Sequence, residues 1–254
     1  MHRRFRAREL QNDRTLVVWL PPGCDGRRRQ HPVVYFHDGQ NIFDPKTAFF
    51  GNAWQAQRAA VELIRAGAIQ PPIMVGIYNT GENRLHEYTP TRGAKNPSPD
   101  ERSRGQLRAY ARFVAEEVVP FIDARYPTVA APAARALAGS SLGGLAALYG
   151  ALWHPNVFGA AAAMSPSVWW DELAAVRFVA SLRRRPPVRL WLDIGTAEPG
   201  WEKTRLLRDA LVARGWRPSG DAADLRYVEV EGAGHHESAW AARIGEVLRW
   251  LFPA

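Results

Sequence analysis

Strand-like and helix-like segments alternate along almost the whole chain. Residues 32–36 and 73–78 are nearly all apolar, which is typical of strands that are buried on both faces of a sheet. Between such segments lie helical patterns, as in residues 107–122, where apolar side chains recur at steps of three and four residues. This alternation predicts the α/β fold class, with a mostly parallel central sheet covered by helices on both faces.

The same patterns predict where each element lies. Strands are expected at residues 14–20, 32–36, 73–78, 134–138, 158–164, 188–194 and 225–230. Helices are expected at residues 54–66, 107–122, 142–153, 171–182, 202–214 and 238–251. A polar stretch at residues 79–99 is too long for a simple connection, and such loops are usually functional or disordered. No repeat or linker interrupts the pattern, so a single domain over residues 1–254 is expected.

Composition narrows the possible partners and compartment. The net charge is +8, but only three of the 33 basic residues are lysine, and the arginine runs 27–29 and 183–185 lie beside Pro or Gly in expected solvated loops. Nucleic acid is therefore not an expected partner.

The N-terminal residues are charged rather than apolar, and no run of about 18 apolar residues could span a bilayer. A cytoplasmic protein without membrane association is expected. Cys24 is the only cysteine, which excludes an internal disulfide.

The segment Gly-Ser-Ser-Leu-Gly at 139–143 matches the G-x-S-x-G pattern, between a short strand and an apolar helix. In that context the pattern indicates a nucleophile elbow, a tight turn that lifts the hydroxyl of Ser141 clear of the sheet. Small residues are required on both sides because side chains there would collide across the turn. Ser141 is therefore the predicted nucleophile.

A serine nucleophile needs a base, and a third group that orients the base. The last expected strand runs into a glycine-rich loop with His235 and His236, of which one can face the nucleophile. The preceding strand offers two carboxylates, and Glu198, in the loop just past that strand, is a better candidate than Asp193 in its body. The run His-His-Glu at 235–237 could also suggest a metal, but no third ligand cluster lies nearby, so no metal is expected.

An oxyanion hole requires two backbone N–H donors. One is expected from Leu142, which follows the nucleophile. The other is expected from Gln40, which follows a glycine in the loop after the strand at 32–36. His37 and Asp38 are interpreted as residues that shape this loop.

Six segments together resemble the putative esterase family of α/β-hydrolases, which includes enterochelin esterases, S-formylglutathione hydrolase and feruloyl esterases. They are HDGQNIFD (37–44), RLHEYTP (84–90), AGSSLGG (138–144), MSPSVWW (164–170), DIGTAE (193–198) and GHHESAW (234–240). In that family a tryptophan follows the catalytic histidine by five positions, which selects His235 through Trp240. The family's acid follows a Gly-Thr pair by two positions, which selects Glu198.

The resemblance implies a serine carboxylic-ester hydrolase that acts on a small-molecule ester and needs no cofactor. The HDGQN loop looks more like members related to siderophore esterases, and aromatic or short-chain acyl esters are also expected. Trp54, Trp169 and Trp170 are candidates for an aromatic acyl pocket, with core packing as the alternative. Arg84 is a candidate for holding an anionic group of the substrate. Two rival functions are acyl transfer by the same triad and a non-catalytic binding module of the same fold.

Overall fold

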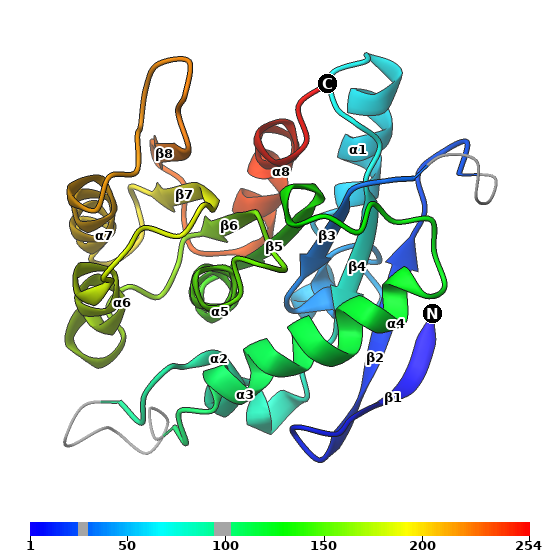
Figure 1. Cartoon of the computed structure of the whole chain (residues 1–254), viewed down its shortest axis with the longest axis horizontal. Helices are drawn as coiled ribbons and strands as arrows, with labels where there is room; N and C mark the ends of the chain where they lie inside the picture. Colours follow the sequence, from blue (N-terminus) through cyan, green and yellow to red (C-terminus); the bar gives the residue numbers. More distant parts are fainter. Residues whose placement is uncertain (25–29, 94–102) are drawn as a thin grey trace.

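The computed structural model describes residues 1–24, 30–93 and 103–254. Its centre is one eight-stranded sheet in the order β1-β2-β4-β3-β5-β6-β7-β8 (Figure 1). The strands are β1 (His2–Ala7), β2 (Asn12–Trp19), β3 (Val33–Phe36), β4 (Ile73–Ile77), β5 (Arg135–Ser140), β6 (Ala160–Met164), β7 (Arg189–Gly195) and β8 (Leu225–Val230).

The six strands from β4 to β8 across the sheet are parallel, whereas β2 pairs antiparallel with both β1 and β4. The predicted mostly parallel α/β sheet is therefore confirmed. Strand β1 was not expected from the sequence, because its six residues include three arginines and only one large apolar side chain, Phe5. It lies at the sheet edge, where such side chains can reach solvent.

Helices cover both faces of the sheet (Figure 1). On one face, α1 (Ala56–Arg65) and α8 (Glu237–Leu251) pack over the strands in one apolar cluster. A second, larger cluster lies on the opposite face. It involves α3 (Leu107–Arg112), α4 (Val119–Asp123), α5 (Leu142–Trp153), α6 (Trp170–Ser181) and α7 (Lys203–Ala213).

Shorter helical turns complete the fold. They are η1 (Gly39–Asn41), η2 (Phe49–Gly51), η3 (Gly81–Asn83), α2 (Arg84–Tyr88) and η6 (Pro132–Ala134). The π-helical turn η5 (Phe113–Val118) joins α3 to α4, so the helix expected at 107–122 is present with one widened turn. The long connection at 79–99 contains η3 and α2, while residues 94–99 and the arginine run 27–29 lie outside the described residues.

The parallel arrangement brings five loops to the same edge of the sheet. Because β3, β5, β6, β7 and β8 point in one direction, the residues that follow them meet at their carboxyl ends, where α/β folds place their sites. Among the described residues, no helix is long and apolar enough to cross a membrane.

The packing of α5 on the sheet depends on small residues. Helix α5 is buried along almost its entire length, and β6 beneath it consists of four alanines and Met164. A Cβ added at Gly144 would come within 2.9 Å of the Met164 carbonyl oxygen, so any larger residue would push the helix off the sheet.

We expect Gly144→Ala to lower the free energy of unfolding by about 1–3 kcal/mol, the usual cost of overpacking. Gly245→Ala on α8 is the matched control, because a Cβ there meets nothing within 4 Å. That change should instead stabilise the protein by roughly 0.5–1 kcal/mol, since glycine is unfavourable inside a helix. Urea denaturation of both variants provides the measurement, and equal stability of Gly144→Ala and the wild type would contradict the packing argument.

Candidate active site

Ser141 occupies the sharp turn between β5 and α5, as the sequence predicts. Its backbone has φ 56° and ψ −124°, a conformation that non-glycine residues rarely adopt. The Ser141 N–H donates a 3.0 Å hydrogen bond to the Met164 carbonyl oxygen, which holds the turn against β6. A Cβ on Gly139 would come within 2.6 Å of the Gly143 backbone, so the turn closes only with glycine there.

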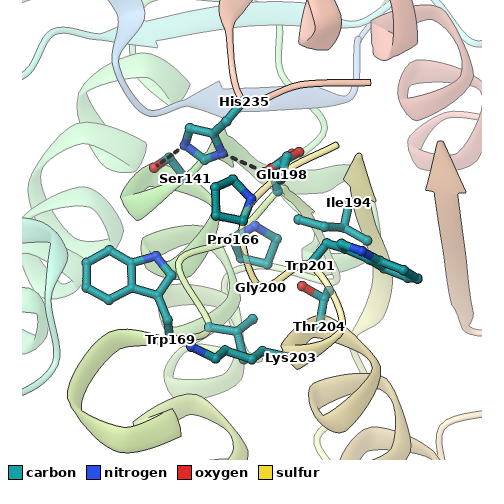
Figure 2. Close-up of a pocket in the computed structure, with 13 residues that line it drawn as sticks. Ser141, Pro166, Trp169, Ile194, Glu198, Gly200, Trp201, Lys203, Thr204 and His235 are labelled. Carbon is teal, nitrogen blue, oxygen red and sulfur yellow. Dashed lines mark hydrogen bonds and ion pairs between the residues drawn. The ribbon is translucent and has the colours of Figure 1, made fainter. Parts of the chain in front are cut away.

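His235 connects Ser141 to Glu198 through both of its ring nitrogens (Figure 2). His235 Nε2 lies 2.9 Å from Ser141 Oγ, and Nδ1 lies 2.6 Å from Glu198 Oε2. The histidine lies in the loop between β8 and α8, and the glutamate lies in the loop after β7. The three predicted residues are thus joined in one line of hydrogen bonds, although they are 37 to 94 positions apart in sequence.

His236 has a different position from its neighbour. It is the residue that caps the N-terminus of α8, and its Nδ1 accepts a hydrogen bond from the Ala239 N–H at 3.2 Å. The His236 ring therefore contacts the N-terminus of α8, and the histidine that contacts the Ser141 hydroxyl is His235. No group of three or more His, Cys, Asp or Glu side chains that could hold a metal occurs among the residues that the structure describes.

Glu198 is held as a carboxylate by three donors. Oε1 accepts hydrogen bonds from the Ser165 hydroxyl at 2.5 Å and from the Gly195 N–H at 2.9 Å, and Oε2 faces His235. Burial acts to raise the pKa of Glu198, but the hydrogen bonds from His235, Ser165 and Gly195 outweigh it and lower that pKa. The ionised form is the one that can accept the Nδ1 hydrogen of a histidine.

Asp193, the rival acid, lies inside the sheet and pairs with a different partner. It is fully buried, and its Oδ1 lies 3.0 Å from Arg243 Nη2 of α8. Its Oδ2 accepts a 2.6 Å hydrogen bond from Trp191 Nε1. Burial raises the pKa of Asp193, and Arg243 opposes that rise. Sequence reasoning did not identify Arg243 or Ser165 in this region, because only the folded chain brings them beside the two carboxylates.

The loop after β3 forms the wall on the other side of Ser141. Gln40 lies in η1, and Gly39 packs so closely on Gly76 of β4 that an added Cβ would come within 2.3 Å of its backbone. Leu142 begins α5, so its N–H has no acceptor within the helix. His37 is buried, its Nδ1 pairs with Tyr110 Oη at 2.9 Å, and burial lowers its pKa to about 4.

Two cavities open beside Ser141, and both include His235 in their walls. One, of about 330 Å³, is lined largely by aromatic and apolar side chains, and also by Ser165, Glu198, Lys203 and Thr204 (Figure 2). The other, of about 460 Å³, is more polar and includes Asp38, Gln40, Arg84 and Glu237. A molecule bound at Ser141 can therefore extend into two environments of different character.

Of the four residues expected from the sequence to bind substrate, two line a cavity and two do not. Trp169 is 46% exposed and lines the aromatic cavity. Trp54 and Trp170 are buried in the two core clusters and line neither cavity, so their expected place in an acyl pocket is corrected to core packing. Arg84 lines the polar cavity, but its charge is paired with Asp38 through two hydrogen bonds of 2.7 and 2.8 Å.

A strand-turn-helix serine, together with a histidine and a carboxylate at the carboxyl edge of a mostly parallel sheet, defines an α/β-hydrolase. Comparison with known proteins agrees with that class. The sequence model of the Putative esterase family matches residues 7–251. The chain therefore belongs to this family of esterases.

Three relatives illustrate the similarity. YbbA of Bacillus subtilis is 28% identical over 94% of this chain and 93% of its own length. The siderophore enterobactin esterase of Emericella nidulans is 32% identical over 78% of this chain and 68% of its own length. The enterobactin esterase FES of Shigella flexneri superposes with a TM-score of 0.77 at 19% identity, over 97% of this chain. This chain spans 57% of the FES structure's length.

The pairing of Asp38 with Arg84 predicts a pH dependence of stability. Burial alone would raise the pKa of Asp38, but Arg84 and Asn79 outweigh it and lower that pKa. A carboxyl group whose pKa is lowered on folding stabilises the protein above its unfolded value of about 3.9, and this contribution is lost as the pH falls further. We expect Asp38→Asn to lower the melting temperature most at neutral pH, with the difference from wild type shrinking below pH about 4.

Asp13→Asn is the matched control for this measurement. Asp13 pairs with Arg6 at 3.4 Å, but both side chains are about half exposed. Exposed pairs contribute little, so this variant should stay close to the wild type throughout. A melting-temperature difference for Asp38→Asn that grows on acidification would contradict the sign of the effect.

Proposed function

We propose that this protein is a carboxylic-ester hydrolase in which Ser141, His235 and Glu198 act as nucleophile, base and orienting acid. The observation that supports this most directly is the hydrogen-bonded line from Ser141 Oγ through both ring nitrogens of His235 to Glu198. It begins on a serine held at φ 56°, at the elbow between β5 and α5. Strained backbone of this kind costs stability and is concentrated at functional sites.

In the first half of the reaction, Ser141 Oγ attacks the ester carbonyl carbon while His235 Nε2 takes the hydroxyl proton. Glu198 accepts the Nδ1 hydrogen, which leaves Nε2 as the acceptor and stabilises the imidazolium that forms. The carbon–oxygen bond of the ester then breaks, and His235 returns the proton to the leaving alcohol. In the second half, water attacks the acyl carbon while His235 Nε2 takes its proton. The bond from the acyl carbon to Ser141 Oγ then breaks, His235 returns the proton to Oγ, and the acid is released.

The negative oxygen of each tetrahedral intermediate needs preorganised donors. The N–H of Leu142 at the start of α5 is well suited, because the first turn of a helix presents unpaired donors. The N–H of Gln40 is the proposed second donor, since Gln40 and Ser141 line the same cavity. These two groups are proposed as the oxyanion hole.

The proposed substrate is an ester with an aromatic, oxygen-rich group, of the siderophore or aromatic acyl type. Trp169 and Trp201 line the smaller cavity and offer flat apolar surfaces, while Lys203 adds a positive charge to the same wall (Figure 2). Aromatic rings bind such surfaces, and an ammonium group attracts a phenolate or carboxylate. The similarity to the siderophore enterobactin esterase of Emericella nidulans supports this substrate class.

Ser141→Ala is expected to lower the turnover of p-nitrophenyl esters by at least about a thousandfold while the protein stays folded, because nucleophile and base act as a unit. Labelling by a fluorophosphonate, located by mass spectrometry, should fall on Ser141 and disappear in the same variant. Ser140→Ala is the matched control and should keep most of the activity, since Ser140 borders the polar cavity but is buried in β5, and His235 Nε2 contacts Ser141 Oγ. If Ser140→Ala were inactive and Ser141→Ala active, the nucleophile would be misassigned.

Lys203→Met is expected to lower kcat/KM for esters of carboxylated or phenolate-bearing aromatic acids by about two- to fivefold, the range for an exposed ion pair. Uncharged aromatic esters of the same size should be unaffected, because the apolar wall remains. Lys46→Met, outside both cavities, is the control for a general loss of positive charge. An equal loss for charged and uncharged esters would remove Lys203 from substrate recognition.

A further inference from the structure

The Ser165 hydroxyl lies directly behind the Glu198 carboxylate, on the side away from His235. Ser165 is buried in the loop after β6, and its Oγ contacts three partners. It accepts hydrogen bonds from Trp240 Nε1 at 3.0 Å and from Arg243 Nη2 at 2.9 Å. It donates one hydrogen bond, of 2.5 Å, to Glu198 Oε1.

These contacts leave the hydroxyl with only one possible orientation. A serine hydroxyl has one proton and two lone pairs. Trp240 and Arg243 can only donate, so they occupy both lone pairs of Ser165 Oγ. The proton must then point at Glu198, and the 2.5 Å separation lies in the range of charge-assisted O–H···O⁻ bonds.

The charges around this hydroxyl also favour an ionised Glu198. Asp193 and Glu198 bring two negative charges close together, and Arg243 pairs with Asp193 at 3.0 Å while donating to Ser165. Two close carboxylates cannot both stay ionised without a nearby cation. His235 hydrogen-bonds to Glu198, and Lys203 lines the same cavity. Arg243 therefore balances Asp193, and Glu198 remains available for His235.

Ser165 adopts this position at a cost in backbone energy. Its φ is 39°, in the left-handed region, where a serine is strained relative to glycine. Trp240 adds a second link to the site, because its ring meets the His235 ring edge to face at 4.9 Å while its N–H holds Ser165. Packing and hydrogen bonding thus over-determine one conformation of a strained residue.

We propose that Ser165 is a positioning residue, whose hydroxyl, fixed by Trp240 and Arg243, orients the Glu198 carboxylate towards His235. This inference rests on the proposed triad. Ser165 borders the aromatic cavity but is only 1% exposed, and its hydroxyl contacts Glu198, Trp240 and Arg243. In this role it acts through Glu198, so its loss should affect turnover rather than substrate binding.

A double-mutant cycle with Glu198→Gln tests this role, because coupling shows whether two residues act through each other. Ser165→Ala should lower kcat about ten- to hundredfold with KM unchanged, corresponding to a hydrogen bond to a charged group. Glu198→Gln alone should lower kcat by at least about a hundredfold. When Ser165→Ala is added to that variant, kcat should fall by less than about a further threefold. The low-field proton NMR resonance of the His235 Nδ1 hydrogen should also move upfield in Ser165→Ala.

Two further variants keep the experiment decisive. Ser165→Gly removes the same hydroxyl but relieves the positive φ, so it gives the same readout if Ser165→Ala folds poorly. Thr128→Val is the matched control, because Thr128 is a buried hydroxyl that donates a 2.6 Å hydrogen bond to Asp123 at the opposite end of the strands. It should reduce stability without changing kcat.

The outcomes separate this inference from the proposed triad. Suppose that Ser141→Ala abolishes activity but that removing the Ser165 hydroxyl leaves kcat unchanged. The positioning role is then overturned and the triad stands. The same holds if removing the hydroxyl lowers kcat by the same factor with and without Glu198→Gln. If Ser141→Ala remains active, the proposed function itself fails. A fall in kcat that vanishes in the Glu198→Gln background supports the positioning role.

Discussion

The close approach of β5, α5 and β6 is the constraint on which the rest of the structure depends. Ser141 stands at φ 56° above the sheet because Gly139 and Gly144 leave no Cβ to collide with the surrounding backbone, while a Cβ on Gly143 would press on the Asp38 side chain at 3.1 Å. The all-alanine stretch of β6 lets α5 lie low on the sheet. In the proposed mechanism, the N-terminus of that helix supplies the Leu142 N–H to the negative oxygen of the intermediate.

The carboxylates of Asp193 and Glu198 lie close to each other but make different contacts. Asp193 and Glu198 come from the same strand and its loop, yet they have different surroundings. Asp193 is fully buried against Arg243, whereas Glu198 lies among hydrogen-bond donors and faces His235. Two similar groups thus have different partners, which supports the proposed assignment of Glu198 rather than Asp193 as the acid that orients His235.

The two cavities beside Ser141 differ in chemical character. The aromatic wall with Trp169 and Trp201 and the polar wall with Asp38 and Arg84 meet at Ser141 and His235. An ester with one flat, apolar half and one polar half would match both surfaces. The pairing of Arg84 with Asp38 makes that cation part of the polar wall itself, which leaves Lys203 as the positive group on the aromatic side.

By itself, the sequence predicted the α/β class, the order of the strands after β1 and of the longer helices, and the serine, histidine and glutamate that lie together at one sheet edge. The class and the elements depend on local patterns of apolar periodicity and glycine spacing, and the site lies where parallel strands end at one edge. The choice of His235 over His236 came from the family resemblance. Only the tertiary structure decided that Trp54 and Trp170 are core residues, that Arg84 pairs with Asp38, and that Ser165 and Arg243 lie beside the carboxylates. Arg243 and Ser165 are 78 positions apart, and no local pattern specifies which side chains meet once helices pack on a sheet.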